Sequence, residues 1–483
     1  MGLKTLKITL LLCAVLALIP AAASASRNQL ALFQDDDLLL DHGDASRESL
    51  LDEVSGLGVD AIKVQLNWSQ VAPTGRHKPS GFDATDPAQY SWGKYDALVR
   101  AAQSRGIRML VTLAGPAPGW ATTGTRRDTV GVNRPSAREY GRFAEAAGEH
   151  FTDVDTWSFW NEPNHHSFLY PQATRSRVPA APHIYRSLVR AGVAGLDRAG
   201  HRGDTILFGE LLPIGKARHF RKNNMKPLEF LREFFCVDSR WRPFRGRAAK
   251  ARGCNRYKRL TGVTGFAYHP YTRSGGPRIK EGSRDDATIG ALDRVTKTLD
   301  IARRHHRIGG RPLPVWNTEF GFQSDPPDAF AAKLRRIPGF LSESEWMSYR
   351  NRRVASYSQY TMTDTPLASR GDLFGTWQAG LRFASGRAKP GVYASYRLPL
   401  FVRLLGPSAV EVWGDARPDG AGATVQVEQR LGRGAFKPLG GPVTVRNVRG
   451  YFLQRYRISK ASRRSFRFAS GGHTSRTTKA AVR

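Results

Sequence analysis

The chain has 483 residues, of which 40% are hydrophobic, and a formal net charge of +33. This length exceeds what one hydrophobic core usually supports, so we expect a large domain and a smaller one with the composition of a globular protein. The basic residues are dispersed, mostly as arginine, without a zinc-finger spacing, an RNP-like aromatic strand or a basic heptad region, which argues against a nucleic-acid-binding protein.

The first 25 residues have the layout of a cleavable secretory signal. Lys4 and Lys7 precede the apolar stretch Ile8–Ile19, and small residues follow up to Ala23-Ser24-Ala25. The apolar core is about 12 residues long, whereas a membrane span needs roughly 20. We therefore expect residues 1–25 to be removed, the mature chain to begin near Ser26, and the protein to be secreted without a membrane span.

Eight short apolar runs alternate with segments of helical spacing. The helical faces include Leu50–Leu57, Tyr140–Ala147 and Ile289–Ala302. Apolar strands that alternate with amphipathic helices indicate a parallel sheet covered by helices, and eight repeats predict an α/β fold, a closed (β/α)8 TIM barrel over residues 26–400. The expected strands are Leu30–Phe33, Asp60–Leu66, Ile107–Leu113, Thr156–Asn161, Thr205–Leu211, Gly265–His269, Leu313–Glu319 and Leu373–Trp377.

Two of these runs end in a carboxylate. Glu162 follows the fourth run, and Glu319 ends the seventh. The carboxyl ends of barrel strands meet at one rim, where strands four and seven lie across from each other. Cleavage of a glycosidic bond uses one carboxyl to protonate the departing oxygen and a second to stabilise or capture the oxocarbenium-like carbon. The pair therefore predicts a sugar-cleaving site.

The cysteines predict one disulfide. Removal of the leader takes away Cys13 and leaves Cys236 and Cys254, an even number in an oxidising compartment. A bond between them would close the arginine-rich loop that they flank. The alternative is a pair of free thiols in a nucleophilic or metal site, but the sequence has no Cys-x-x-Cys spacing and no accompanying histidine pattern.

The pattern changes after Pro399. Short alternating segments broken by glycine and proline predict a small β-sandwich domain over residues 401–470. Residues 471–483 are small, polar and basic, and we expect them to be disordered.

The motifs resemble those of the clan A glycoside hydrolases, which are retaining enzymes with a (β/α)8 barrel. Trp160-Asn161-Glu162-Pro163-Asn164 resembles family 39, whereas His269-Pro270-Tyr271 and Thr318-Glu319-Phe320-Gly321 equally resemble family 5 cellulases. The resemblance covers about residues 28–400, and it implies that Glu162 is the general acid and then base and that Glu319 is the nucleophile. It also implies supporting roles: Asn161 binds the sugar 2-hydroxyl, Tyr271 donates to Glu319, His269 lines the same wall, and Trp377 forms a stacking floor for the sugar ring.

Three further residues are expected near the substrate. Lys63 lies on the second strand, where family 5 relatives usually carry an arginine that positions the nucleophile; lysine keeps the charge but loses the planar fork. Trp68 and Trp120, after strands two and three, would extend the sugar platform, although ordinary packing under a loop is an equal alternative.

The leading hypothesis is a secreted retaining hydrolase of β-glycosidic bonds, acting on an oligosaccharide or polysaccharide without a cofactor or a metal. A carbohydrate-binding protein that has lost turnover is an alternative, against which the presence of both glutamates argues. A second alternative, a polyanion-binding surface protein, depends on charge alone. An acidic cell-wall polymer is the candidate partner for that charge, and an arginine-biased composition is the simpler account of it.

Overall fold

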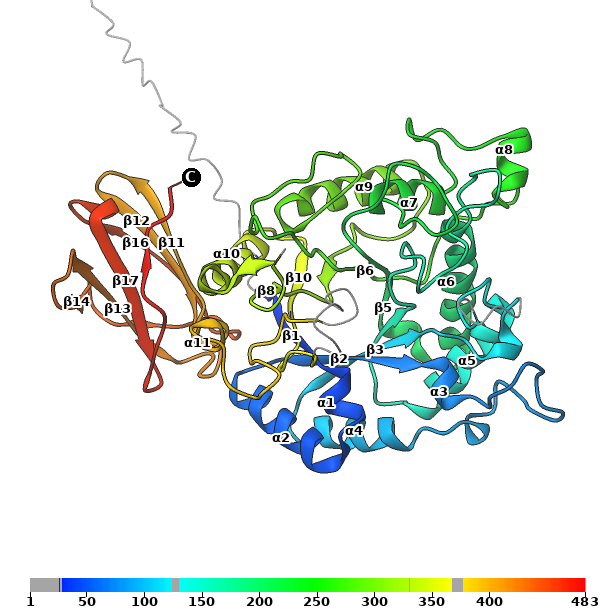
Figure 1. Ribbon diagram of the computed structural model, residues 1–483, viewed down its shortest axis with the longest axis horizontal. Helices are drawn as coiled ribbons and strands as arrows, with labels where there is room; N and C mark the ends of the chain where they lie inside the picture. Colours follow the sequence, from blue (N-terminus) through cyan, green and yellow to red (C-terminus); the bar gives the residue numbers. More distant parts are fainter. Residues whose placement is uncertain (1–25, 27, 124–129, 330, 367–376, 483) are drawn as a thin grey trace, which may run out of the picture.

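The computed structural model describes residues 26, 28–123, 130–329, 331–366 and 377–482, so the expected leader lies outside the described residues. Eight parallel strands close a barrel in the order β1-β10-β7-β6-β5-β4-β3-β2, which confirms the predicted TIM barrel (Figure 1). The strands are β1 (Leu30–Gln34), β2 (Ala61–Asn67), β3 (Arg108–Ala114), β4 (Thr156–Phe159), β5 (Thr205–Leu211), β6 (Gly265–Tyr268), β7 (Val315–Asn317) and β10 (Val354–Tyr360).

Helices pack around this barrel and return the chain from the carboxyl end of one strand to the amino end of the next. Their apolar faces and the outer faces of the strands form one continuous core, as the helical spacing predicts. The helices are α1 (Asp36–Leu40), α2 (Gly43–Gly56), α3 (Trp68–Val71), α4 (Gly93–Gln103), α5 (Ala137–His150), α6 (Ala181–Arg198), α7 (Pro227–Phe234), α8 (Gly246–Ala251), α9 (Leu292–Arg304), α10 (Ile337–Tyr349) and α11 (Val392–Arg397). Among the described residues, no helix combines the length and the apolar character needed to cross a membrane.

The side chains inside the barrel change from apolar to polar along its axis. Alternate residues of each strand point inward. Near the amino ends, a separate apolar cluster fills the interior, with Leu30, Leu32, Ala61, Leu110, Leu207, Ala267 and Trp316 as members. Toward the carboxyl ends, buried polar side chains replace them, namely Lys63, Thr112, Ser158, Glu210, His269 and Thr318. The polar layer supports the rim on which both glutamates lie.

The prediction that Leu373–Trp377 forms the eighth strand is wrong. The eighth barrel strand is β10, Val354–Tyr360, and most of the expected run lies outside the described residues, with Trp377 outside any strand. The sequence of β10 does not read as an apolar run because its inward residues are serines. Ser356 and Ser358 donate to the main-chain carbonyls of Asn317 and Thr318, which satisfies their hydroxyls inside the barrel.

A C-terminal pair of antiparallel sheets confirms the predicted β-sandwich. One sheet has the order β11-β12-β16, and the second is built around β13 and β17. Apolar side chains from both sheets form a core that is separate from that of the barrel. The strands are β11 (Leu400–Gly406), β12 (Ala409–Asp415), β13 (Thr424–Leu431), β14 (Lys437–Pro438), β15 (Val443–Thr444), β16 (Tyr451–Arg457), β17 (Arg464–Ser470), β18 (His473–Thr474) and β19 (Thr478–Lys479).

The expectation of a disordered tail over residues 471–483 is also wrong for the described part, which ends at residue 482. β18 and β19 both pair with β17. Beyond them, the amide of Ala481 donates to the carbonyl of Val402, and the carbonyl of Ala481 accepts from the amide of Leu404. These are main-chain contacts, so the polar and basic side chains that suggested disorder do not prevent them.

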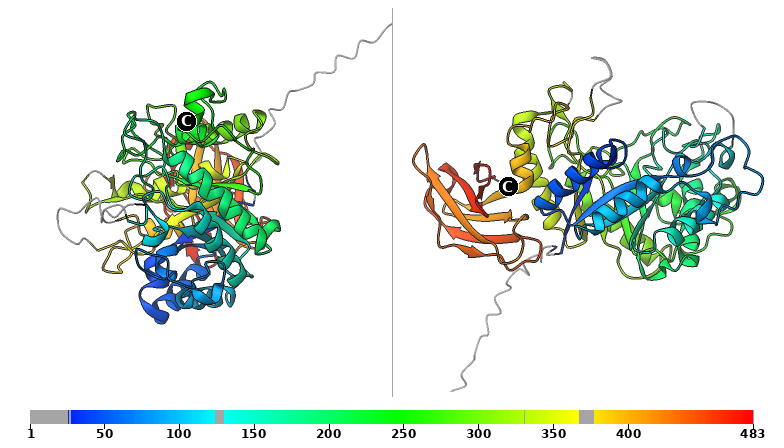
Figure 2. Two further views of the ribbon diagram at one scale, coloured as in Figure 1. Left: turned by 90° about the vertical axis from the view of Figure 1, so that its right-hand side faces the viewer. Right: turned by 90° about the horizontal axis from the view of Figure 1, so that it is seen from below.

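The β-sandwich lies beside α10 and α11 at the edge of the barrel (Figures 1 and 2). Tyr349 of α10 packs with Phe401, Trp413 and Tyr451 of the β-domain. Next to this cluster, the buried guanidinium of Arg417 pairs with Glu345 of α10 and with Asp415, and it donates to the carbonyl of Tyr396 at 3.0 Å. The interface therefore contains both an apolar cluster and a buried ion-pair network.

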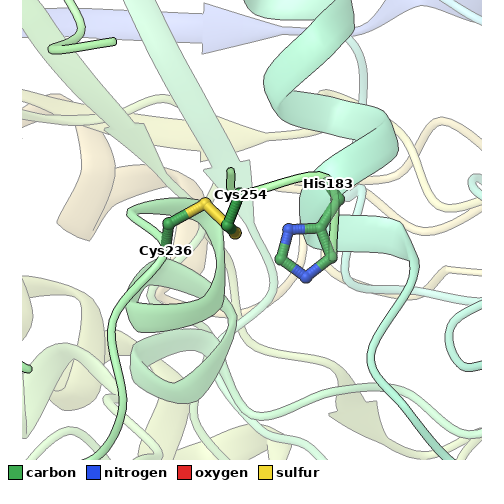
Figure 3. Close-up of side chains that lie close together, drawn as sticks. All are labelled: His183, Cys236 and Cys254. Atoms are coloured by element: carbon green, nitrogen blue, oxygen red, sulfur yellow. A yellow bond between two sulfur atoms is a disulfide. The ribbon is translucent and has the colours of Figure 1, made fainter. Parts of the chain in front are cut away.

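Cys236 and Cys254 form the predicted disulfide, with their Cα atoms 5.7 Å apart. The bond joins the end of α7 to the segment after α8, and the imidazole of His183 from α6 lies beside it (Figure 3). His183 instead contacts Glu233 at 3.2 Å and Arg186 at 2.8 Å. Since both sulfurs are bonded to each other, this cluster is structural and is not a set of free thiol ligands.

The ion pair at the domain interface generates a prediction of stability. The substitution Glu345→Gln leaves the buried charge of Arg417 with Asp415 alone, and the expected loss in free energy of unfolding is about 3 kcal/mol. Urea denaturation measures it. The control Glu428→Gln removes the partially exposed partner of Arg467 on the β-sandwich, and it should cost less than about 1 kcal/mol. Equal losses of stability in the two variants would contradict the larger stabilisation that we assign to the Arg417 ion pairs.

Candidate active site

Glu162 lies immediately after β4, on a backbone that packing holds in an uncommon conformation. The φ angles of Trp160 and Glu162 are +61° and +36°, in the left-handed region that side chains rarely adopt. The fully buried indole of Trp160 donates to the carbonyl of Phe168 at 2.9 Å. The side chain of Asn164 bonds both the amide and the carbonyl of Leu212, each at 3.0 Å, and so ties this segment to the loop after β5. The acid segment is therefore fixed from both sides.

Glu319 lies two residues after β7, and three donors surround its carboxylate. The hydroxyl of Tyr271 donates to Oε1 at 2.9 Å, which is the contact expected of this tyrosine. On the other oxygen, Lys63 Nζ lies 3.6 Å and His269 Nδ1 lies 3.8 Å from Oε2. The carboxylate is therefore held by a hydroxyl on one oxygen and faces a cation on the other.

The two glutamates converge. A side-chain oxygen of Glu162, a side-chain oxygen of Glu319 and a ring nitrogen of His269 all lie within 4.8 Å of one another. Next to them is a cleft of about 610 Å³, whose lining includes Glu162, His165, Tyr271, Arg273, Phe322 and Trp377. Its walls come from the segments after β4, β5, β6, β7 and β10, at the carboxyl ends of the strands. A cleft of this size accommodates a small organic ligand or a few sugar rings.

Asn161 precedes the cleft-lining Glu162 in the chain, and Trp377 lines the cleft itself. Asn161 is almost fully buried, and its Oδ1 has no hydrogen-bond partner among the described residues. Trp377 is 38% exposed and lines the cleft, and its ring lies 5.5 Å from that of Tyr271. An unpaired buried acceptor and an exposed aromatic face both suit a ligand that carries hydroxyl groups and C–H faces.

A buried charge cluster lies beneath the two glutamates, and the sequence analysis missed its central member, Glu210. This fully buried residue of β5 accepts from Lys63 Nζ at 3.1 Å and contacts His269 Nε2 at 2.6 Å. The other ring nitrogen of His269 lies 3.0 Å from Oε1 of Glu162. The available signal was a glutamate inside the otherwise apolar run Thr205–Leu211.

These contacts shift the pKa values of the cluster. Burial raises the pKa of Glu162, although the adjacent His269 opposes the shift. Burial alone would favour neutral His269, but the carboxylates of Glu319, Glu162 and Glu210 outweigh it and raise the pKa of His269 to about 9. Burial likewise opposes the charges of Glu210 and Lys63, yet their mutual attraction keeps the pKa of Glu210 below and that of Lys63 above its ordinary value.

Glu162, His269 and Glu319 are close enough to be compared with a metal site, but their surroundings do not fit one. Both ring nitrogens of His269 already face carboxylates, Glu162 on one side and Glu210 on the other. The ammonium group of Lys63 lies 3.6 Å from Glu319, and a second cation there would be repelled. The donor set therefore suits proton transfer better than metal binding.

The structure does not place either expected platform tryptophan at the cleft. Trp68 is fully buried and stacks on Phe143 at 5.4 Å, so its placement at a sugar platform is wrong. Trp120 packs edge-on against Trp68 at 6.0 Å, and its indole donates to the carbonyl of Pro73 at 2.8 Å. Apolar packing beneath loops, and not ligand contact, explains both residues.

A larger hollow of about 840 Å³ lies between the end of α10 and the β-domain. Its lining, all within the described residues, includes Tyr349, Arg446 and Gln454 but no carboxylate, histidine or thiol. It therefore lacks the acid–base groups that the barrel cleft contains.

Comparison with known proteins identifies similar folds. No protein-family model matches the chain, and no curated protein matches it by sequence. A family 39 glycoside hydrolase from the gut symbiont Bacteroides cellulosilyticus WH2 aligns with a TM-score of 0.51 and 15% identity over 93% of this chain and 82% of that chain. A glucosidase from Croceicoccus marinus aligns with a TM-score of 0.51 and 12% identity over 94% of this chain and 97% of that chain. At these identities the likeness is one of fold.

The raised pKa of His269 predicts a pH dependence of stability. A group whose pKa is higher in the folded than in the unfolded state stabilises the fold fully below its unfolded pKa, and this contribution is lost as the pH rises through the folded value. Between pH 6.5 and about 9, the free energy of unfolding should therefore fall by about 3 kcal/mol. Urea denaturation at several pH values measures this fall.

The matched variants are His269→Gln, which should remove most of the fall, and His306→Gln, an exposed histidine whose loss should leave it unchanged. A wild-type protein with constant stability across this pH range would contradict the protonation assigned to His269.

Proposed function

We propose that the protein is a retaining glycoside hydrolase in which Glu162 is the general acid and base and Glu319 is the nucleophile. The observation that carries the proposal is the approach of their carboxylate oxygens within 4.8 Å beside a cleft. Retaining glycosidases hold their two carboxyl groups about 5–5.5 Å apart, whereas inverting enzymes leave room for a water at about 6.5–9.5 Å. The short separation favours retention.

In the first step, an oxygen of Glu319 attacks the anomeric carbon while the bond from that carbon to the leaving-group oxygen breaks. Glu162 gives its proton to that oxygen, so the leaving group departs as a neutral alcohol. Burial raises the pKa of Glu162, which favours its protonated form more than in an exposed glutamate. Lys63 and the hydroxyl of Tyr271 contact the carboxylate of Glu319 and orient it.

In the second step, ionised Glu162 takes a proton from a water, whose oxygen attacks the anomeric carbon of the glycosyl-enzyme. The bond from that carbon to Glu319 breaks, and the carboxylate is restored. The buried Oδ1 of Asn161 would accept from the sugar 2-hydroxyl, and Trp377 would stack on the sugar ring. Two displacements at the same carbon give net retention.

A β-linked oligosaccharide is the substrate class that we assign. Both fold relatives named above are enzymes of glycosides, one a family 39 glycoside hydrolase and the other a glucosidase. The signal-like layout of residues 1–25 and the disulfide between Cys236 and Cys254 support secretion. A carbohydrate-binding protein without turnover is the alternative, but a binder does not need a buried acid next to a second carboxylate.

Turnover of aryl β-glycosides tests the proposal. Glu162→Ala should lower kcat/KM, which reports the step in which the leaving group departs, about 10²–10⁴-fold for a phenyl leaving group and much less for a dinitrophenyl group, which departs without a proton. Added azide should then yield a glycosyl azide of retained configuration from Glu162→Ala and one of inverted configuration from Glu319→Ala. Proton NMR distinguishes the two products.

The control is Glu343→Ala, a partly buried glutamate outside the cleft, which should keep wild-type activity. Saturable sugar binding with no release of aglycone by the wild type would favour the binding protein. A first sugar product of inverted configuration would contradict retention.

A second function, the binding of an acidic polysaccharide, is favoured by one basic surface. We define this surface by residues 239–262 and 303–312, which contain no aspartate or glutamate. The two segments touch, because Leu260 pairs with Ile308 and the ring of Trp241 stacks on His305 at 5.9 Å. The exposed cations are Arg240, Arg242, Arg245, Arg247, Lys250, Arg256, Lys258, Arg259, Arg304 and Arg311.

This basic surface leads into the amino ends of β6 and β7, so it lies at the opposite end of the barrel from the cleft. A polymer held there leaves the cleft open. Arginine forks bind carboxylate, sulfate or phosphate groups in pairs of hydrogen bonds. We infer that the surface retains the enzyme on a polyanionic glycan or an acidic cell-wall polymer.

Binding to a polyuronate at several salt concentrations tests this second proposal. The triple substitution of Arg245, Arg247 and Lys250 by Gln should weaken binding about tenfold or more and flatten its salt dependence. Substitution of Arg433, Lys437 and Arg457 on the β-domain makes the same charge change elsewhere and should have a smaller effect. Equal losses in both triples, or tighter binding of the wild type to duplex DNA, would contradict the assignment.

A further inference from the structure

Glu210 points into the barrel because β5 contains a bulge. The pairing of β5 with β6 shifts register between Gly209 and Leu211, so one extra residue is inserted in β5. Glu210 itself has a φ of +48°, and Gly209 has a φ of +126°. A Cβ on Gly209 would lie 2.2 Å from the carbonyl oxygen of Ala267, so only glycine fits there. The backbone is distorted at the point that aims this carboxylate inward.

Five side chains from five different strands or strand ends surround the carboxylate of Glu210. Ser158 lies 2.6 Å and Thr112 lies 3.4 Å from Oε1, while His269, Thr318 and Lys63 lie 2.6, 2.7 and 3.1 Å from Oε2. Each of these groups can donate a hydrogen bond, and two of them, Lys63 and His269, can carry a positive charge. A buried carboxylate with this many donors is ionised and accepts on both oxygens.

An ionised Glu210 determines which proton His269 carries. Since the carboxylate only accepts, the proton between it and the imidazole lies on Nε2 of His269. The second nitrogen, Nδ1, then faces Oε1 of Glu162 at 3.0 Å. One further proton is shared across this contact: it lies on Nδ1 when Glu162 is ionised and on Oε1 when Glu162 is the acid.

The other charged groups around His269 either disfavour or favour its protonated, charged form. Lys63 lies 3.4 Å from Nε2 and disfavours a charged imidazole, whereas Glu319, 3.8 Å from Nδ1, favours it. Asp36, the first residue of α1, interacts with Lys63. Glu210 contacts both Lys63 and His269. Its negative charge therefore offsets the charge of Lys63, which would otherwise favour loss of the proton from His269.

We propose that Glu210 is a positioning residue of the reaction, which holds His269 with Nε2–H toward itself and Nδ1 toward Glu162 and thereby retains the proton that Glu162 delivers to the leaving group. The inference rests on the glycosidase function proposed above, and it assigns a role to a residue that touches neither the cleft nor the reacting atoms. No bond to substrate forms or breaks at Glu210. Its effect reaches the reaction only through His269.

A purely structural account is the competing explanation, because removing any buried partner of Lys63 costs stability. The two accounts differ in the pH profile. If Glu210 holds the shared proton, its neutralisation lowers the pKa at which Glu162 loses that proton. If Glu210 only supports the fold, the amount of active enzyme falls and the profile keeps its shape.

The experiment compares Glu210→Gln with Glu345→Gln, which removes a buried ion-paired carboxylate at the domain interface. In Glu210→Gln, the alkaline limb of kcat/KM should move down by about one pH unit or more. The loss at neutral pH should be about tenfold or more for phenyl β-glycosides and under about threefold for dinitrophenyl β-glycosides, whose leaving group needs no proton. Glu345→Gln should lower stability and leave both the limb and the leaving-group dependence unchanged.

A direct measurement accompanies the kinetics. Nitrogen-15 NMR of histidine-labelled protein, with His269 assigned by its absence in His269→Gln, should show Nε2 protonated in the wild type and a lower titration midpoint in Glu210→Gln. Glu210→Asp keeps the buried charge but shortens the side chain, so it should fold and move the limb and the midpoint in the same direction by a smaller amount. This variant decides the question if Glu210→Gln does not fold.

The outcomes separate the two proposals. An active wild type whose alkaline limb and His269 midpoint do not change in Glu210→Gln or Glu210→Asp overturns this inference and leaves the glycosidase function intact. A wild type that hydrolyses no glycoside, but whose His269 midpoint falls in Glu210→Gln, overturns the glycosidase function and supports the link from Glu210 to His269.

Discussion

The balance of charge inside the barrel is the constraint on which the rest of the site depends. Two acidic side chains within 4.8 Å of each other cannot both remain ionised in a buried setting without cations beside them. Lys63 and His269 supply that positive charge. Glu210 contacts both cations and so holds them beneath the two glutamates. Because the compensating groups come from β2, β5 and β6, the closed barrel must form before any of these ionisation states is stable.

The sequence predicted the parts of the fold and the site that follow from periodicity and strand order. Apolar runs at regular intervals identified seven of the eight barrel strands, because strands covered on both faces need apolar side chains on both. Glu162 and Glu319 could be paired because the carboxyl ends of parallel strands share one rim. The contact of Tyr271 with Glu319 was expected only from the resemblance to the clan A enzymes, and it is possible because Tyr271 comes after β6, the neighbour of β7.

The parts that the sequence did not predict depend on which way a side chain points. Ser356 and Ser358 make β10 look polar, although both hydroxyls are satisfied by carbonyls of the neighbouring strand end. Glu210 faces inward only because of a one-residue bulge, and a single sequence does not reveal a bulge. Trp68 resembled a sugar platform because tryptophan suits both roles, and only its stacking on Phe143 of α5 decides between them.

The β-domain supports the side of the barrel that carries Glu319. Phe320, the next residue, packs against Tyr357 of β10 at 5.6 Å, and the hydroxyl of Tyr357 bonds Ser344 of α10 at 2.9 Å. The adjacent Glu345 is the residue that pairs with Arg417 of the β-domain. A rigid wall matters here because a nucleophile displaced by about 1 Å loses much of its rate. The strained residues Trp160 and Glu162 are held on the other side of the site, by the contacts of Trp160 with Phe168 and of Asn164 with Leu212, so the two glutamates are supported by separate packing.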